Sequence, residues 1–392
     1  MARSVGRWMA LVAVAALILL VLLGLQPGRP GRGGLQAQAQ APVGLEPAAR
    51  IDPWKAPDLP TRSEMIYDTW ETIGVSDGLP SDRVTTLLVE ADALWVGTDR
   101  GLAVRRNDEW TVYTRDDGLA HGYITALARD NGAGDLWIGT LAGLSRLSGG
   151  AIRSFTQMNS GLANDVVYDV EAEDGLIWTA TAAGVCCLDT RDMSWLVRDH
   201  LNSIMHEPWC YSVATGAGHL WVGVWGGGVV ELELERGTWR EYRDPDGEME
   251  IDLLKDDGPI HDVSAFVAYD QGVLWQATYF GLSRYDGRRW RSYVAADTGL
   301  AGDFISHVHA RGHTVWIASD QGLSVFDGET CVTYLRDDRG HCVVSSWRGG
   351  EQMETHELET AFADNYLLWV QANEEEVWLA TGRGLSHGFK TK

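Results

Sequence analysis

Hydrophobic and small residues recur along this chain in one short pattern. An apolar residue precedes a Trp, small residues follow it, and Gly-Leu or Gly-Val stands six or seven positions after the Trp. Around each copy lie short runs of β-branched and aromatic residues separated by Asp, Asn or Gly, as is typical of strands joined by tight turns. The Trp residues of the pattern are Trp95, Trp137, Trp178, Trp221, Trp275, Trp316 and Trp378.

The spacing of these Trp residues defines a repeat. Four of the six steps are 41 to 43 residues long, and the other two are 54 and 62. The copy over residues 84–114 resolves into four strand-sized pieces, at 84–89, 94–98, 102–105 and 110–114. A period near forty residues built from four short strands indicates a β-propeller. The pattern therefore predicts an all-β fold of seven blades, each a four-stranded antiparallel sheet.

The repeated Trp and Gly residues have structural explanations. Burying an aromatic side chain of 150–250 Å² stabilises a fold by roughly 4–6 kcal/mol as an upper estimate, so the seven Trp residues are interpreted as packing between blades. The repeated Gly, for example Gly101, falls where the second strand turns into the third, and such turns often need positive φ.

The outer strands are out of phase with the Trp pattern. Each blade should end in a short segment that resembles Trp110–Tyr113, but one such segment, Trp70–Ile73, precedes the first Trp copy. Only a few residues follow the last copy at Trp378. We therefore expect the N-terminal strand to complete the last blade and close the ring, which protects sheet edges.

The repeat resembles a known family. Gly78–Thr85 followed by Leu94–Leu102, and a second copy over Gly118–Leu144, are similar to the two-component regulator propeller repeat. The resemblance covers about residues 65–389. Such repeats occur in extracytoplasmic sensor regions of bacterial hybrid histidine kinases, where the propellers contribute to recognition of carbohydrate-type ligands. No kinase module follows the last blade here, so we expect any kinase-type output to come from another chain.

The composition excludes some classes of binding partner. The formal net charge is −23, and nucleic acid or anionic lipid would require basic patches, so neither is expected as a partner of the folded part. Five Cys residues leave at least one unpaired in an exported chain. Cys331 and Cys342 could form a disulfide, whereas the other three are interpreted as buried apolar residues. No metal-ligand spacing and no cofactor motif is present, so we expect neither a metal nor a cofactor.

The N-terminus predicts export. Arg3 and Arg7 precede an uncharged apolar stretch from Trp8 to Leu25. Residues 1–25 are interpreted as a hydrophobic helix that acts as a signal anchor or as a cleaved signal peptide, and an anchor is favoured. Residues 26–62, rich in Pro, Gly, Ala and Gln, predict a flexible tether to a propeller over residues 63–392. Both alternatives place the propeller outside the cytoplasm, either in the periplasm or at the cell surface.

Candidate ligand-binding residues come from the expected channel mouth. His121 and His261 lie three residues before the expected starts of two innermost strands. His206, or its neighbour Glu207, and His356 are assigned to the same column with a less certain register. Such a column either forms a polar ligand site or reflects the wet environment of a channel mouth.

Other candidates lie in loops and insertions. Trp225, among glycines, and Trp347 are expected to be exposed and able to stack on sugar rings. Residues 243–260 and 336–357 interrupt the repeat and are interpreted as inserted loops. The first contains Asp244–Glu248, which is interpreted as a solvated acidic segment because the later ligands of a calcium loop are missing.

The leading hypothesis is an exported, membrane-tethered propeller that binds a small ligand, of carbohydrate type in line with the resemblance, or a partner protein. No nucleophile motif is recognisable, so catalysis is not favoured. One alternative is a hydrolase or lyase that uses a His-lined channel mouth. Another is a structural subunit of an envelope complex, since the fold alone does not decide function.

Overall fold

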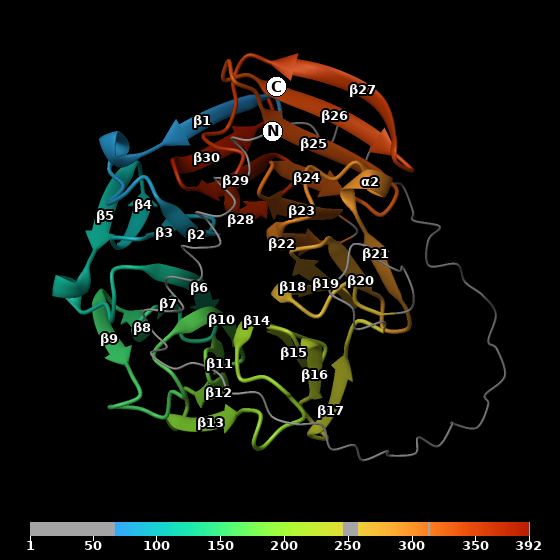
Figure 1. Ribbon diagram of the computed structural model, residues 1–392. Coiled ribbons are helices and arrows are strands. Elements are labelled where there is room, and N and C mark those ends of the chain that lie inside the picture. The colour runs from blue at the N-terminus through green and yellow to red at the C-terminus, as the bar shows by residue number, and fades with distance from the viewer. Residues whose placement is uncertain (1–66, 246–257, 313, 392) are drawn as a thin grey trace, which may run out of the picture. The chain divides into compact units, whose positions relative to one another are not determined.

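The computed structural model describes residues 67–245, 258–312 and 314–391, which form seven antiparallel sheets around a common axis (Figure 1). The expected all-β, seven-bladed propeller is confirmed. We number the blades 1 to 7 in the chain order of their innermost strands. The predicted N-terminal helix and tether, residues 1–62, lie outside the described residues. Among the residues that are described, no helix is long and apolar enough to cross a membrane.

The innermost and second strands of the blades follow the repeat. The innermost strands of blades 1 to 7 are β2 (Val84–Val89), β6 (Ile124–Asp130), β10 (Val167–Glu173), β14 (Cys210–Gly216), β18 (Ser264–Asp270), β22 (Ile305–Arg311) and β28 (Leu367–Ala372). The second strands carry the repeated Trp and are β3 (Leu94–Thr98), β7 (Asp135–Thr140), β11 (Leu176–Thr181), β15 (His219–Val224), β19 (Val273–Thr278), β23 (Thr314–Ser319) and β29 (Glu376–Thr381).

The outer strands complete each sheet. The third strands are β4 (Leu102–Arg106), β8 (Gly143–Ser148), β12 (Gly184–Asp189), β16 (Gly228–Glu233), β20 (Leu282–Tyr285), β24 (Leu323–Phe326) and β30 (Gly384–Phe389). The fourth strands are β5 (Glu109–Tyr113), β9 (Ala151–Phe155), β13 (Ser194–Arg198), β17 (Thr238–Tyr242), β21 (Trp290–Tyr293), β25 (Thr330–Arg336) and β1 (Thr69–Ile73). Short helical turns lead into three blades, namely η2 (Val75–Asp77), η3 (Arg115–Asp117) and α2 (Ala295–Thr298).

The repeated Trp residues pack between blades, as expected. All seven are at most 8% exposed. Trp95 of blade 1, for example, shares a core with Ile124 and Leu136 of blade 2. Because each Trp fills the space between two sheets, the same residue at the same place in every repeat sets the spacing of the blades.

The turn between the second and third strands explains the repeated Gly. In blade 1 the hydroxyl of Thr98 donates to the carbonyl of Gly101 at 2.9 Å, and the same bond recurs in five other blades. Gly101 has φ 151°, and a Cβ there would lie 2.7 Å from the Tyr113 carbonyl oxygen. A larger residue would therefore push the outer strand away.

Hydroxyl groups also join neighbouring innermost strands. The side chains of Thr85, Thr125 and Ser306 each donate to the carbonyl that begins the innermost strand of the next blade, at 2.6 to 2.7 Å. Each of these residues lies at an irregularity where the innermost strand shifts register against its neighbour. The bulge turns the side chain out of its own sheet and toward the next blade.

The seventh sheet combines strands from the two ends of the described chain. Strand β1 pairs antiparallel with β30, with Trp70 opposite Gly388. Trp70 is 4% exposed and contacts Phe362, with ring centroids 5.1 Å apart. The phenol of Tyr67 accepts from the indole of Trp316 in blade 6 at 2.8 Å, so the segment before β1 also contacts a second blade.

Blade 6 differs from the four-stranded prediction. Its sheet has six strands, because residues 336–357, interpreted as a loop, form most of a hairpin of β26 (Cys342–Arg348) and β27 (Glu351–Leu358). The hairpin lies at the outer rim of the ring (Figure 1). The other insertion falls largely outside the described residues, including most of Asp244–Glu248.

Two further expectations concern this blade. Trp347 is partly exposed, its indole donates to Thr333 at 3.2 Å, and its ring covers Gly299, where any Cβ would collide with it. Cys331 and Cys342 form no disulfide. The strand register explains this, since Cys331 lies opposite Trp347 and Cys342 lies opposite Arg336, at the other end of the same strand pair.

Candidate functional site

Two sets of residues share the face of the ring at which the innermost strands begin, here called the upper face. One set directly precedes the innermost strand and the other directly follows the second strand. Backbone hydrogen bonds hold the two sets together: the N–H of Trp225 donates to Trp209 at 3.0 Å, and that of Asp320 donates to Phe304 at 3.1 Å. Side chains at these positions therefore gather at one edge of each blade.

Aromatic side chains form a continuous row across blades 3 to 6 at this face. Ring centroids are 4.5 Å apart for Tyr168 and Tyr211, 5.2 Å for Tyr211 and Trp225, 5.6 Å for Trp225 and Tyr279, and 4.0 Å for Tyr279 and Phe304. We call these five residues the aromatic row. All five side chains are partly exposed, so the row offers ring faces to a ligand while each ring is held by its neighbours.

The tyrosines of the aromatic row are neutral. Burial raises the pKa of Tyr279 to about 12 and also raises the pKa of Tyr211 and of Tyr168. A hydrogen bond from Tyr211 partly offsets the shift at Tyr168. Phenols that stay protonated offer hydroxyl donors and acceptors beside their apolar rings, a combination that suits ligands with both polar groups and flat apolar faces.

The upper face also carries charged side chains. The guanidinium of Arg83 lies 5.9 Å from the ring centroid of Tyr123. Burial raises the pKa of Asp320 and also the pKa of Asp303, whose carboxylate accepts the N–H of Ala295 at 2.7 Å. Burial, followed by the charge of Asp320, raises the pKa of Tyr366, and the charge of Arg83 partly offsets this shift. The face thus combines the aromatic row with charged groups of both signs, and two of these groups, Asp303 and Asp320, adjoin Phe304 of the row.

Two carboxyl groups, those of Asp169 and Glu171, lie on β10 after Tyr168 of the aromatic row. Asp169 is 4% exposed and accepts from the Ser212 hydroxyl at 2.9 Å and the Val213 N–H at 3.0 Å, both in the next blade. Burial raises its pKa to about 6 despite these hydrogen bonds. Burial, followed by the charges of Asp169 and Glu173, raises the pKa of Glu171 to about 8. The interior below Tyr168 therefore disfavours further negative charge.

Three predicted histidines lie near the upper face, and each has a partner in its own blade. The Nδ1 atoms of His121 and His261 accept the N–H two residues later, each at 2.9 Å. Asn164 makes the same contact in blade 3, so these residues cap the turn into the innermost strand. His206 is exposed and lies 3.3 Å from Glu241 of the outer strand β17.

His356 is not in this column at all. It lies on β27, at the outer rim of blade 6, because the inserted hairpin shifts the sequence count. The residue that stands three positions before β28 is Asp364, which caps the N–H of Tyr366 at 3.2 Å. In the part of the chain that the structure describes, no cluster of metal-ligating groups joins the four predicted histidines.

One trio of potential metal ligands is present among the described residues, and it lies elsewhere. Asp337, His341 and Glu357 gather near the β25–β26 turn. Arg339 lies 2.7 Å from Asp337 and 2.8 Å from Glu357, so a guanidinium already neutralises both carboxylates. We interpret the trio as an ion-pair network that fixes the hairpin.

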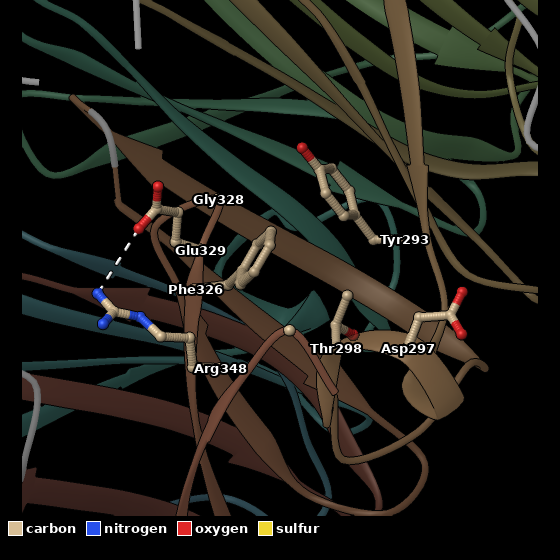
Figure 2. Close-up of a pocket in the computed structure, with 8 residues that line it drawn as sticks. Tyr293, Asp297, Thr298, Phe326, Gly328, Glu329 and Arg348 are labelled. Carbon is tan, nitrogen blue, oxygen red and sulfur yellow. Dashed lines mark ion pairs between the residues drawn. The ribbon is translucent and has the colours of Figure 1, made fainter. Parts of the chain in front are cut away.

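A shallow hollow of about 390 Å³ adjoins the same hairpin (Figure 2). The rings of Tyr293 and Phe326 form its apolar part, and Arg348 pairs with Glu329 at 3.6 Å on its rim. Tyr293 and Phe326 pack edge to face at 4.9 Å and belong to the packing between blades 5 and 6. The hollow is thus a surface feature of the hairpin, distinct from the aromatic row.

Comparisons with known proteins concern the fold. No family model and no curated protein matches the sequence. Among solved structures, the extracellular domain of BT3049 from B. thetaiotaomicron, assigned to a hybrid two-component system, is 14% identical with a TM-score of 0.62. The alignment covers 82% of this chain and 42% of that one. The chain shares the fold of this extracellular domain. The expected resemblance to two-component propellers is thereby confirmed at the level of the fold.

Two further structures are similar. The extracellular domain of BT4673 from B. thetaiotaomicron, assigned to a one-component system, is 14% identical over 82% of this chain and 42% of that one, with a TM-score of 0.57. Virginiamycin B lyase from Staphylococcus aureus is 12% identical over 83% of this chain and 99% of that one, with a TM-score of 0.56. The chain thus spans less than half the length of the two extracellular domains.

Of the predicted site residues, the aromatic row includes only Trp225. The other four members were not recognised because the count was made three residues before each innermost strand, where the side chains cap a turn. Counting one residue before that strand would have found Phe304, and counting one residue after the second strand would have found Tyr279.

Proposed function

We propose that this chain is an extracytoplasmic ligand-binding module whose ligand stacks on the aromatic row. The observation that carries the proposal is the run of five partly exposed rings in contact across four blades. Stacked and edge-to-face rings that are held by neighbours lose little side-chain entropy on binding, which favours affinity. The neutral phenols and the charged groups of the upper face would orient polar groups of the ligand.

The ligand class that fits this surface is a carbohydrate. Sugar rings combine apolar C–H faces with many hydroxyl groups, which matches flat rings beside phenol hydroxyls. The fold shared with extracellular domains of two-component and one-component systems is in keeping with a sensory role outside the cytoplasm. We further propose that residues 1–25 tether the propeller to the membrane. Fractionation of cells that express the chain with and without residues 1–25 tests the tether separately from ligand binding.

The test of binding uses the full chain on an array of immobilised neutral and acidic glycans. The strongest glycan is then titrated by calorimetry against the wild type and the variants Trp225→Ala and Tyr279→Ala. Loss of one stacking ring should lower the affinity roughly tenfold. The matched control is Trp239→Ala, which removes an indole from the outer strand of the same blade as Trp225 and should leave the affinity unchanged. Equal losses in all three variants, or no glycan bound, would contradict the proposal.

A further inference from the structure

The aromatic row ends beside a carboxylate. Trp225 and Tyr279 directly follow the second strands of blades 4 and 5, and Asp320 holds the same position in blade 6. The N–H of Asp320 donates to the carbonyl of Phe304, the last ring of the row, at 3.1 Å. Asp320 is partly exposed, as the rings of the row are. The position that offers a ring face in two blades therefore offers a charged group in the third.

A glycine keeps the carboxylate of Asp320 close to the backbone that carries Phe304. A Cβ on Gly302 would lie 2.8 Å from Oδ1 of Asp320, so any side chain at this position would displace the carboxylate. Asp303, the next residue, is also partly exposed, and its carboxylate accepts the N–H of Ala295 at 2.7 Å. Phe304 is thus adjoined by two carboxyl groups, one before it in the chain and one hydrogen-bonded to its carbonyl through the backbone.

The protein supplies no counter-charge to these two carboxylates. Among the described residues, no Lys, Arg or His forms an ion pair with Asp303 or Asp320. Burial raises the pKa of both carboxyl groups, and the charge of Asp303 adds to the shift at Asp320. A partly buried carboxylate without a counter-charge costs stability, and such groups concentrate at functional sites. A cationic group of a ligand would compensate them.

Guanidinium groups of the upper face belong to other blades. That of Arg83, before β2 in blade 1, lies 5.9 Å from the ring centroid of Tyr123 in blade 2. That of Arg383 in blade 7 pairs with Asp364 at 3.0 Å. Neither contributes to the pKa shift of the two carboxyl groups beside Phe304. The formal net charge of −23 also favours the approach of a cationic ligand over an anionic one.

We propose that the ligand of the aromatic row is a carbohydrate with a protonated amino group, which is bound by the carboxylate of Asp320 and a ring face of Phe304. Phe304 stacks on Tyr279 with ring centroids 4.0 Å apart, so its position is fixed before the ligand arrives. An ammonium group gains from a charge-assisted hydrogen bond to a carboxylate and from the negative face of an aromatic ring. The apolar face of the same sugar would stack on the remaining rings, so this assignment rests on the proposed function.

Two sugars that differ only in acetylation of the nitrogen test the assignment. A tetramer of glucosamine and a tetramer of N-acetylglucosamine are each titrated by calorimetry into the full chain at about pH 6, where the free amine is protonated. The wild type should bind the glucosamine tetramer roughly tenfold more tightly, because the acetylated nitrogen carries no charge. Added salt should reduce this difference, since it screens the attraction between the ammonium group and the carboxylate.

Variants without the charge identify the carboxylate. Asp320→Asn should abolish the preference and leave the affinity for the N-acetylglucosamine tetramer unchanged, because the amide keeps the shape of the side chain. Asp303→Asn can still accept the Ala295 N–H and should reduce the preference by a smaller factor. The matched control is Asp116→Asn, exposed in the turn η3 that leads into blade 2, which carries no member of the aromatic row. It removes the same charge and should keep the preference. Circular dichroism checks that the variants fold.

The outcomes separate the amino group from the proposed function. Equal binding of both tetramers by the wild type, or a preference that survives Asp320→Asn, would overturn the assignment of the amino group and leave the aromatic row as the binding site. An equal loss of preference in Asp116→Asn and Asp320→Asn would indicate a general effect of net charge and would overturn it as well. If neither tetramer binds, the assignment is wrong, and the glycan array decides whether the proposed function is wrong too.

Discussion

Single residues on β10 give the upper part of the ring a pH-dependent stability. The carboxyl of Glu171 has a pKa of about 8, against an ordinary value of 4.5, chiefly because burial disfavours its charged form. The folded state therefore holds a proton that the unfolded chain releases between these two pH values. The contribution of Glu171 to stability is greatest below pH 4.5, falls as the pH rises toward 8, and stays constant above it.

We predict that Glu171→Gln removes this loss. The neutral amide avoids the cost of a buried charge, so the variant should melt about 1–3 °C above the wild type at pH 8.5, with little difference at pH 4.5. The partial exposure of Glu171 keeps the expected gain small. Thermal unfolding followed by circular dichroism at both pH values measures it. Glu109→Gln, an exposed carboxylate on β5, is the control and should change Tm at neither pH.

The carboxylate of Asp169 accepts hydrogen bonds from the neighbouring blade. Its carboxylate accepts the Val213 N–H and the Ser212 hydroxyl, both of which are buried. We predict that Asp169→Ala costs about 1–3 kcal/mol, because a buried N–H would lose its partner. Urea unfolding at pH 7 measures the change. A variant as stable as the wild type would show that water replaces the carboxylate.

At the scale of elements, the pairing of β1 with β30 determines whether the last blade is complete. Without β1 the third strand of blade 7 becomes an edge, and Tyr334 loses the N–H of Tyr67, which donates to its hydroxyl at 3.0 Å. We infer that this strand closes the ring, in line with the expectation from the sequence.

We predict that deletion of residues 64–74 lowers Tm strongly and leads to aggregation, because a long edge is exposed. The milder Trp70→Ala should destabilise by about 3–5 kcal/mol, as for other buried aromatic truncations. Light scattering during a thermal ramp reports both effects. Unchanged melting of the deletion variant would exclude a closing role for β1.

The sequence predicted the elements better than the site. The Trp of each repeat packs between blades, and the Gly allows a turn that every blade needs. Their spacing can therefore be recognised from the sequence alone. The hairpin β26–β27 was missed although Gly349-Gly350 is a turn signal, because the insertion follows no repeat. The aromatic row was missed because its residues differ from blade to blade. Their proximity depends on where each strand starts, and the position counted from the sequence lies two residues before the position of Phe304.

For the whole molecule, the cysteines make a simple prediction. All five are buried and unpaired, and burial raises the pKa of the Cys187 thiol and of the Cys342 thiol to about 12. The native protein should therefore not react with a thiol reagent such as Ellman's reagent, and five thiols should react in denaturant. Addition of a reductant should leave Tm unchanged. Fewer than five reactive thiols in denaturant would indicate a disulfide.

The shared seventh sheet also brings the two ends of the described chain together. The N–H and hydroxyl of Thr391 donate to the carboxylate of Asp68 at 2.8 and 2.9 Å. Anything attached before Tyr67 and anything fused after Thr391 must therefore leave the ring at the same spot. Tension between two such attachments would act on the antiparallel pair β1 and β30 and would not load the other six blades. The mechanical strength of the assembly would then be that of the hydrogen bonds between these two short strands.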